Sequence, residues 1–140
     1  MNEKITQSYL TEDLKKKIYA GFNTAAIAAV GVDGLAEPPV AFQQYDGSEF
    51  VGAVVAQMFW GQLHVKYLLI EDKYRKCGIG RRLMERIFEF GKERKCSFVF
   101  VETMSFQAPE FYQKLGFVVE YVRHGYSNGT SFYYLRKDLG

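Results

Sequence analysis

The most constraining feature of the sequence is a change of hydrophobic period between residues 62 and 103. Residues 62–70 (QLHVKYLLI) are predicted as a strand. From residue 78 to 95, apolar side chains recur at helical spacing, at Ile79, Leu83 and Ile87. A buried strand, 97–103 (SFVFVET), follows. Because a strand, a helix and a second strand in this order form a right-handed parallel unit, we expect a parallel pair with a crevice at its carboxyl ends.

The flanking segments predict the rest of one α/β domain over residues 1–140. Strands 40–45 and 49–59 should join 62–70 in an antiparallel meander, with 49–59 inside the sheet because it is apolar on both faces. After the parallel pair, a short helix at 109–115 precedes strands 117–123 and 131–137. At the N-terminus, we expect a helix over 11–22, capped by Thr11, and a loop with at most a short helix over 23–38.

Charge and composition exclude several classes of protein. The chain has 18 basic and 16 acidic residues, without the concentrated basic face of a nucleic-acid-binding protein. The basic residues cluster only locally, at 75–82, which suits a small anion. No apolar run approaches the roughly 20 residues of a membrane span, and the polar start does not resemble a signal peptide. Two cysteines, Cys77 and Cys96, do not form a disulfide framework, so a cytoplasmic location is expected.

The loop before the predicted helix carries the main functional signal. In YRKCGIGRR, a helix start leaves backbone N–H groups unpaired, and Gly78 and Gly80 have no Cβ to keep a phosphate away. Arg75 and Lys76 add positive charge. This pattern indicates a pyrophosphate site, although the glycines alone would also suit a tight turn and close packing. The phosphate motifs of dinucleotide-binding and P-loop proteins are absent.

Two segments together resemble the Gcn5-related N-acetyltransferase (GNAT) superfamily. LLIEDKYRKCGIGRRLM is similar to the family's acetyl-CoA motif, whose pattern falls on Arg75, Gly78 and Gly80. SFQAPEFYQKLGF, residues 105–117, is similar to its later motif. The resemblance implies a GNAT-like mixed sheet flanked by helices, with antiparallel N-terminal strands and a central parallel pair, and an enzyme that acetylates a primary amine by direct transfer from acetyl-CoA.

The resemblance also implies roles for individual residues. The backbone at the end of the strand, Leu68, Leu69 and Ile70, would pair with the pantetheine amides. The pyrophosphate would lie on residues 75–81, namely Arg75, Lys76, Cys77, Gly78, Ile79, Gly80 and Arg81. Tyr112 would protonate the leaving thiolate; a core aromatic is the alternative. Ser105 stands where the family often has Asn, which puts one pantetheine contact in question.

The reaction also needs a group that removes a proton from the attacking amine. His64 is a candidate, because the unperturbed pKa of histidine, about 6.5, suits a base; a core or solvated histidine is the alternative. Glu102, at the end of a strand beside the crevice, would serve as a base, bind a cationic amine, or simply be exposed. A nucleophilic Cys77 is not required by direct transfer. Phe59 and Trp60, near a turn, would line the acceptor pocket or simply pack, and packing is favoured.

Two functions remain open at this point. The first is an active N-acetyltransferase, which Tyr112 favours because a sensor needs no proton donor there; the second is a non-catalytic acyl-CoA-binding sensor on the same fold. The acceptor, a small molecule or a peptide amine, is not identified by the sequence, because the fold does not decide it. No metal, nucleic acid or membrane partner is expected, and the resemblance allows a homodimer.

Overall fold

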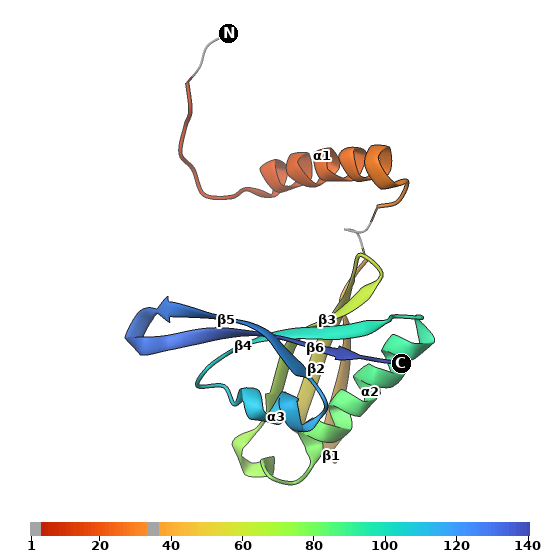
Figure 1. Ribbon diagram of the computed structural model, residues 1–140, viewed down its shortest axis with the longest axis vertical. Helices are drawn as coiled ribbons and strands as arrows, with labels where there is room; N and C mark the ends of the chain where they lie inside the picture. The colour runs from red at the N-terminus through yellow and green to blue at the C-terminus, as the bar shows by residue number, and fades with distance from the viewer. Residues whose placement is uncertain (1–3, 34–36) are drawn as a thin grey trace. The chain divides into compact units, whose positions relative to one another are not determined.

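The computed structural model describes residues 4–33 and 37–140, and the chain divides into two compact units, residues 1–36 and 37–140 (Figure 1). The first unit contains one helix, α1 (Glu12–Val30), and the second contains all the strands and the remaining helices. One domain over residues 1–140 stays a prediction. Within the described ranges, every helix is too short or too polar to cross a membrane.

Helix α1 starts where the sequence predicts and ends later. The Leu14 N–H donates to Thr11 Oγ1 at 3.1 Å, so the predicted cap is confirmed. The helix continues to Val30, and the loop predicted from residue 23 is wrong for 23–30. Alanine-rich sequence (NTAAIAAV) favours helix strongly, and Gly31 ends it with φ of 80° and an N–H bond to the Ile27 carbonyl. Residues 34–36 of that predicted loop lie outside the described residues.

The second unit is a six-stranded sheet in the order β1-β2-β3-β4-β6-β5. β2 lies inside the sheet, as its two apolar faces predict, and β3 and β4 form the predicted parallel pair. The predicted strands and helices are confirmed with small shifts at their ends. They are β1 (Val40–Asp46), β2 (Glu49–Phe59), β3 (Gln62–Ile70), α2 (Ile79–Glu93), β4 (Phe98–Met104), α3 (Pro109–Lys114), β5 (Val118–Tyr126) and β6 (Thr130–Asp138), with 3-10 turns at Asp72–Tyr74 and Ser127–Gly129.

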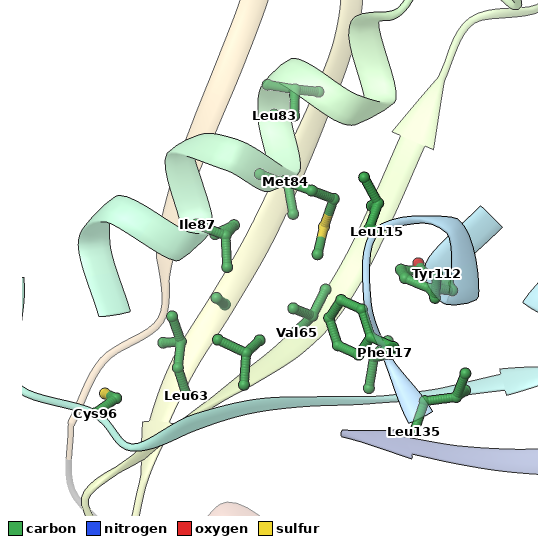
Figure 2. Close-up of a cluster of buried hydrophobic side chains, with 14 of the residues drawn as sticks. Leu63, Val65, Leu83, Met84, Ile87, Cys96, Tyr112, Leu115, Phe117 and Leu135 are labelled. Carbon is green, nitrogen blue, oxygen red and sulfur yellow. The ribbon is translucent and has the colours of Figure 1, made fainter. Parts of the chain in front are cut away.

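Helices α2 and α3 share one hydrophobic core with the inner face of the sheet (Figure 2). The apolar stripe of α2 supplies Leu83, Met84 and Ile87, none more than 5% exposed. Each such side chain contributes roughly 1.5–3 kcal/mol by leaving water. Along β4, Val99 and Val101 point into this core, so the alternating residues Phe98, Phe100 and Glu102 lie on the opposite face of the sheet.

Candidate functional site

The central feature of the site is the point where the two parallel strands stop pairing. β3 and β4 pair at Leu63 with Val99, His64 with Phe100, and Val65 with Val101. Beyond these pairs, both strands continue, but Lys66–Ile70 is not paired with Glu102–Met104. The predicted crevice at the carboxyl ends is therefore a gap that opens within the sheet.

A β-bulge lies at the start of this gap. Val65 and Tyr67 pair with the consecutive β2 residues Ala56 and Val55, so Lys66 is an extra residue. Because a bulge bends its strand and increases the local twist, it accounts for the divergence of β3 from β4. The backbone of Leu68–Ile70 stays paired with β2 on one side and presents its other edge to the gap. Its N–H and C=O groups there need partners from water or from a ligand.

The loop after β3 leads into α2 with two residues in the left-handed region. Lys76 has φ of 64°, and Gly78, the N-cap of α2, has φ of 78°. In the described parts of the chain, no side chain caps this helix, so its first N–H groups are free for an anion. Arg75 lies 3.0 Å from Asp72 in an exposed ion pair. The side chain of Arg81 lines a pocket of about 470 Å³ that also includes Lys92 and Lys137.

Gly80 has a structural reason to be glycine, which is the close packing that the sequence predicted as the alternative to a phosphate site. A Cβ at this position would lie 3.0 Å from Cζ and 3.2 Å from Cε1 of the Phe111 ring. The close packing of the Phe111 ring on α2 therefore leaves little room for a side chain at Gly80. At Gly78 a Cβ would meet only Arg82, at 3.9 Å, so there the positive φ is the constraint.

Tyr112 lies in the core, on the α3 side of the sheet. Its ring makes edge contacts with Phe111 and Phe117, at centroid distances of 5.1 and 5.5 Å, and only 8% of the residue is exposed (Figure 2). Burial raises the pKa of Tyr112 to about 12. The hydroxyl therefore stays protonated at neutral pH, and it is a weaker acid than an ordinary tyrosine.

His64 and Glu102 meet on the other face of the sheet. His64 Nε2 lies 2.9 Å from Glu102 Oε1, and the two side chains are 20% and 26% exposed. The imidazole also stacks on Phe100, with centroids 4.5 Å apart and planes 2° apart. The bond to Glu102 and the stacking on Phe100 thus restrict both the rotation and the position of the His64 ring. The pair bridges β3 and β4 at the start of the gap, which the sequence did not predict because it treated the two residues separately.

The remaining predicted residues are distributed around this centre. The Ser105 N–H donates to the Ser131 carbonyl, and its Oγ accepts from the Ser131 N–H at 3.0 Å, so Ser105 prolongs the pairing of β4 with β6. Cys77 is exposed in the loop before α2. Cys96 is buried, and burial raises the pKa of its thiol, as expected for a packing residue. Within residues 4–33 and 37–140, no group of three His, Cys, Asp or Glu side chains could hold a metal ion.

A pocket lies on the His64 side of the sheet, where the sequence raised an acceptor pocket only as the less favoured role of Phe59 and Trp60. It has a volume of about 330 Å³ and includes Glu102. Phe59 and Trp60 line it and are 49% and 41% exposed, and the Phe59 ring also packs edge-on against Phe100 at a centroid distance of 6.2 Å. A signal was present: Trp60-Gly61 forms the whole turn between two strands, and tryptophan is unusual in such a turn.

Comparisons with known proteins agree on one family. A model of the acetyltransferase (GNAT) family matches residues 8–117. Blasticidin-S acetyltransferase of Streptomyces morookaense is 35% identical over 92 residues, which cover 65% of this chain and 68% of that protein. A putative acetyltransferase from Agrobacterium tumefaciens has a TM-score of 0.84 at 22% identity over 99% of both chains. A putative streptothricin acetyltransferase from Bacillus anthracis, in complex with acetyl coenzyme A, has a TM-score of 0.66 at 20% identity over 75% of this chain and 65% of that one.

Proposed function

The chain belongs to the acetyltransferase (GNAT) family, and we propose that it moves an acetyl group from acetyl-CoA to a primary amine. The observation that carries this proposal is the His64–Glu102 pair, 2.9 Å apart at the point where β3 and β4 diverge. Beside it lie a free strand edge and, after a short loop, an uncapped helix start. Amine acetylation by acetyl-CoA requires a base, a strand edge that binds the pantetheine amides and a site that binds the phosphates.

The residues around the gap fit acetyl-CoA. The backbone edge of Leu68–Ile70 suits a chain of amides, since it offers N–H and C=O groups without a strand partner on that side. The uncapped N–H groups at the start of α2, with Lys76 and Arg81 nearby, suit a pyrophosphate. When bound, acetyl-CoA supplies the activated acetyl group as a thioester. Ser105 contributes less than the resemblance implied, because its backbone N–H and Oγ already bond to Ser131.

His64 and Glu102 prepare the amine for attack. When His64 Nε2–H donates to the Glu102 carboxylate, Nδ1 keeps its lone pair and can accept a proton. The carboxylate then stabilises the imidazolium that forms. The stacking of His64 on Phe100 holds the ring in place, which keeps the reacting nitrogen oriented.

Tyr112 serves the leaving group from the opposite face. It lies with α3 on the core side of the sheet, whereas His64 and Glu102 lie on the other side. The amine can therefore lose its proton on one side of the gap while the sulfur receives a hydrogen bond on the other. With a pKa of about 12, the Tyr112 hydroxyl remains protonated and stabilises the developing thiolate mainly as a hydrogen-bond donor.

The acceptor in this proposal is a small molecule. The relative at 35% identity is named for blasticidin-S, a small molecule, and the pocket beside Glu102 has a volume of about 330 Å³, at the lower end of the range for ligand pockets. A peptide would need an extended groove instead. This identity covers 92 residues and leaves the individual acceptor open.

Thiol release tests the proposal directly. The full-length protein is incubated with acetyl-CoA and a panel of small amines, peptides and proteins, and free CoA is measured with a chromogenic thiol reagent while products are identified by mass spectrometry. We expect amine-dependent thiol release with a matching N-acetylated small molecule. Binding of acetyl-CoA by calorimetry without release on any amine would reject the enzyme and favour the sensor.

A further inference from the structure

The pocket on the His64 side of the sheet is walled mainly by aromatic rings. Its volume is about 330 Å³, and it opens on the face opposite α2. Glu102 lines it, and the same carboxylate bonds to His64, so the pocket adjoins the candidate base. The rings in its wall are Phe59, Trp60, Phe98, Phe100 and Tyr134.

Trp60 is held in this wall by an unusual backbone. Trp60 and Gly61 form the two-residue turn between β2 and β3, with φ of 49° and 83°. Asn-Gly is the preferred pair where both residues have positive φ, and this chain uses it elsewhere, at Asn128-Gly129 with φ of 60° and 71°. A bulky residue in the left-handed region is strained, and such strain concentrates at functional sites. The requirements of the turn therefore do not account for a tryptophan at this position.

Glu120 enters the pocket through a second irregularity. Val119 pairs with Leu135 and Tyr121 with Tyr134, so Glu120 is an extra residue that forms a β-bulge in β5. A bulge redirects its side chain. Glu120 lines the pocket, and within residues 4–33 and 37–140 it makes no hydrogen bond or ion pair. A second carboxylate is thus available beside Glu102.

The third charged residue of the pocket is Arg136, which is partly exposed. Arg136 Nε lies 2.9 Å from Asp138 Oδ1, and its guanidinium lies over the Phe98 ring at 3.8 Å. The wall therefore already stacks one planar cation of the protein itself. Two carboxylates, that of Glu102, which also bonds to His64, and that of Glu120, outnumber this guanidinium, so the pocket favours a cation over an anion.

We infer that the acceptor is a small primary amine joined to a planar aromatic ring by a short aliphatic chain, without a carboxylate. The ring lies against the aromatic wall, and the amine extends toward His64 and Glu102. Offset or edge-on contacts with several rings favour a planar group over a saturated one of equal size. This inference rests on the proposed function, because it assigns the acceptor of the same site.

Trp60 provides a direct measurement, because it is the only tryptophan in the chain. Its fluorescence is followed while 2-phenylethylamine is added to the full-length protein without acetyl-CoA. Two comparators change one property each: 2-cyclohexylethylamine keeps the amine and loses the planar ring, and phenylalanine adds a carboxylate. We expect saturable binding of 2-phenylethylamine, on the order of ten-fold tighter than either comparator. Equal affinities, or no fluorescence change with any of the three, would overturn the inference.

Two substitutions locate the effect. Glu120→Gln should weaken 2-phenylethylamine binding several-fold, while Glu93→Gln, at an exposed carboxylate of α2, should not. Trp60→Asn should lower kcat/KM for 2-phenylethylamine on the order of ten-fold. The same substitution should leave the Tm equal or higher, because asparagine suits this turn. A lower Tm with unchanged kcat/KM would mean that Trp60 only packs.

The two proposals fail in different ways. If thiol is released equally well with aromatic and saturated amines, the inference about the acceptor is rejected and the acetyltransferase stands. If 2-phenylethylamine binds tightly by fluorescence but no amine supports thiol release, the pocket assignment stands and the catalytic proposal is rejected.

Discussion

His64 and Glu102 stand 38 residues apart in the sequence, yet their Nε2 and Oε1 atoms lie 2.9 Å apart. The parallel register of β3 and β4 produces this contact, since His64 is aligned with Phe100, two residues before Glu102. Neither side chain is fully buried, so the pair remains accessible from the gap. A partly exposed ion pair adds little to the free energy of unfolding. We therefore expect loss of this pair to affect turnover more than stability.

Substituting the pair should lower turnover. His64→Gln and Glu102→Gln should each reduce kcat roughly 10²-fold or more, and the double variant should be little worse than either, because the two residues act as a unit. His124→Gln is the control, because His124 bonds to Ser131 on the β5–β6 hairpin. Parental kinetics in a folded His64→Gln protein would exclude a direct role.

Removing the Tyr112 hydroxyl should slow the chemical step without preventing folding. A hydrogen bond to a charged group contributes about 1.5–3 kcal/mol, so Tyr112→Phe should lower turnover roughly 10- to 100-fold. Affinity for acetyl-CoA should change little, and a more acidic leaving thiol should reduce the defect. The rate is measured in a single turnover so that product release does not mask it. An unchanged single-turnover rate would remove Tyr112 from the mechanism.

Tyr112 should also affect stability at alkaline pH. Burial raises its pKa to about 12, so above about pH 10 an unfolded chain loses this proton before the folded protein does. The unfolded state then binds fewer protons, and the free energy of unfolding falls as pH rises through that window. Tyr112→Phe should weaken this decline in urea unfolding between pH 8 and pH 10.5, whereas Tyr9→Phe, at a residue 96% exposed, should not. If the free energy of unfolding declines equally with pH in the parent and in Tyr112→Phe, the pKa of Tyr112 is not raised in the folded protein.

Gly80 should tolerate no side chain while Phe111 is present. Gly80→Ala places a methyl group 3.0 Å from the Phe111 ring, and such overpacking costs about 1–3 kcal/mol. Phe111→Leu should relieve much of this cost, which thermal unfolding of the two single variants and the double variant can measure. If the stability losses of the two single variants add up in the double variant, the contact with Phe111 is not what disfavours a side chain at position 80. A test of the phosphate loop should therefore avoid substitutions at Gly80.

Charge near the start of α2 should determine affinity for the phosphates. Lys76→Gln combined with Arg81→Gln should weaken acetyl-CoA binding by about ten-fold or more and reduce its dependence on salt. Lys95→Gln, beyond the opposite end of α2, is the matched control. Calorimetry at two salt concentrations measures both effects. Equal affinity of the double variant and the control would place the phosphates elsewhere.

The sequence by itself determined the order of elements and the position of the Gly-rich loop before α2. Hydrophobic periods are local, so the three-strand meander, the stripe of α2 and the parallel pair could be read directly from residues 40–103. The N-terminal helix was cut short because the period became ambiguous after residue 22, whereas alanine propensity and the cap at Gly31 continued it to Val30.

The tertiary structure alone decided which side chains meet. The extra residues Lys66 and Glu120 become visible only when paired strands are compared, and they open the gap and direct a carboxylate into the pocket. The sequence showed His64 and Glu102 as separate candidates, and the register of two strands joined them. It predicted either a phosphate site or close packing at Gly80, and the structure identified Phe111 as the packing neighbour. Contacts between distant segments depend on register and packing, which no local pattern specifies.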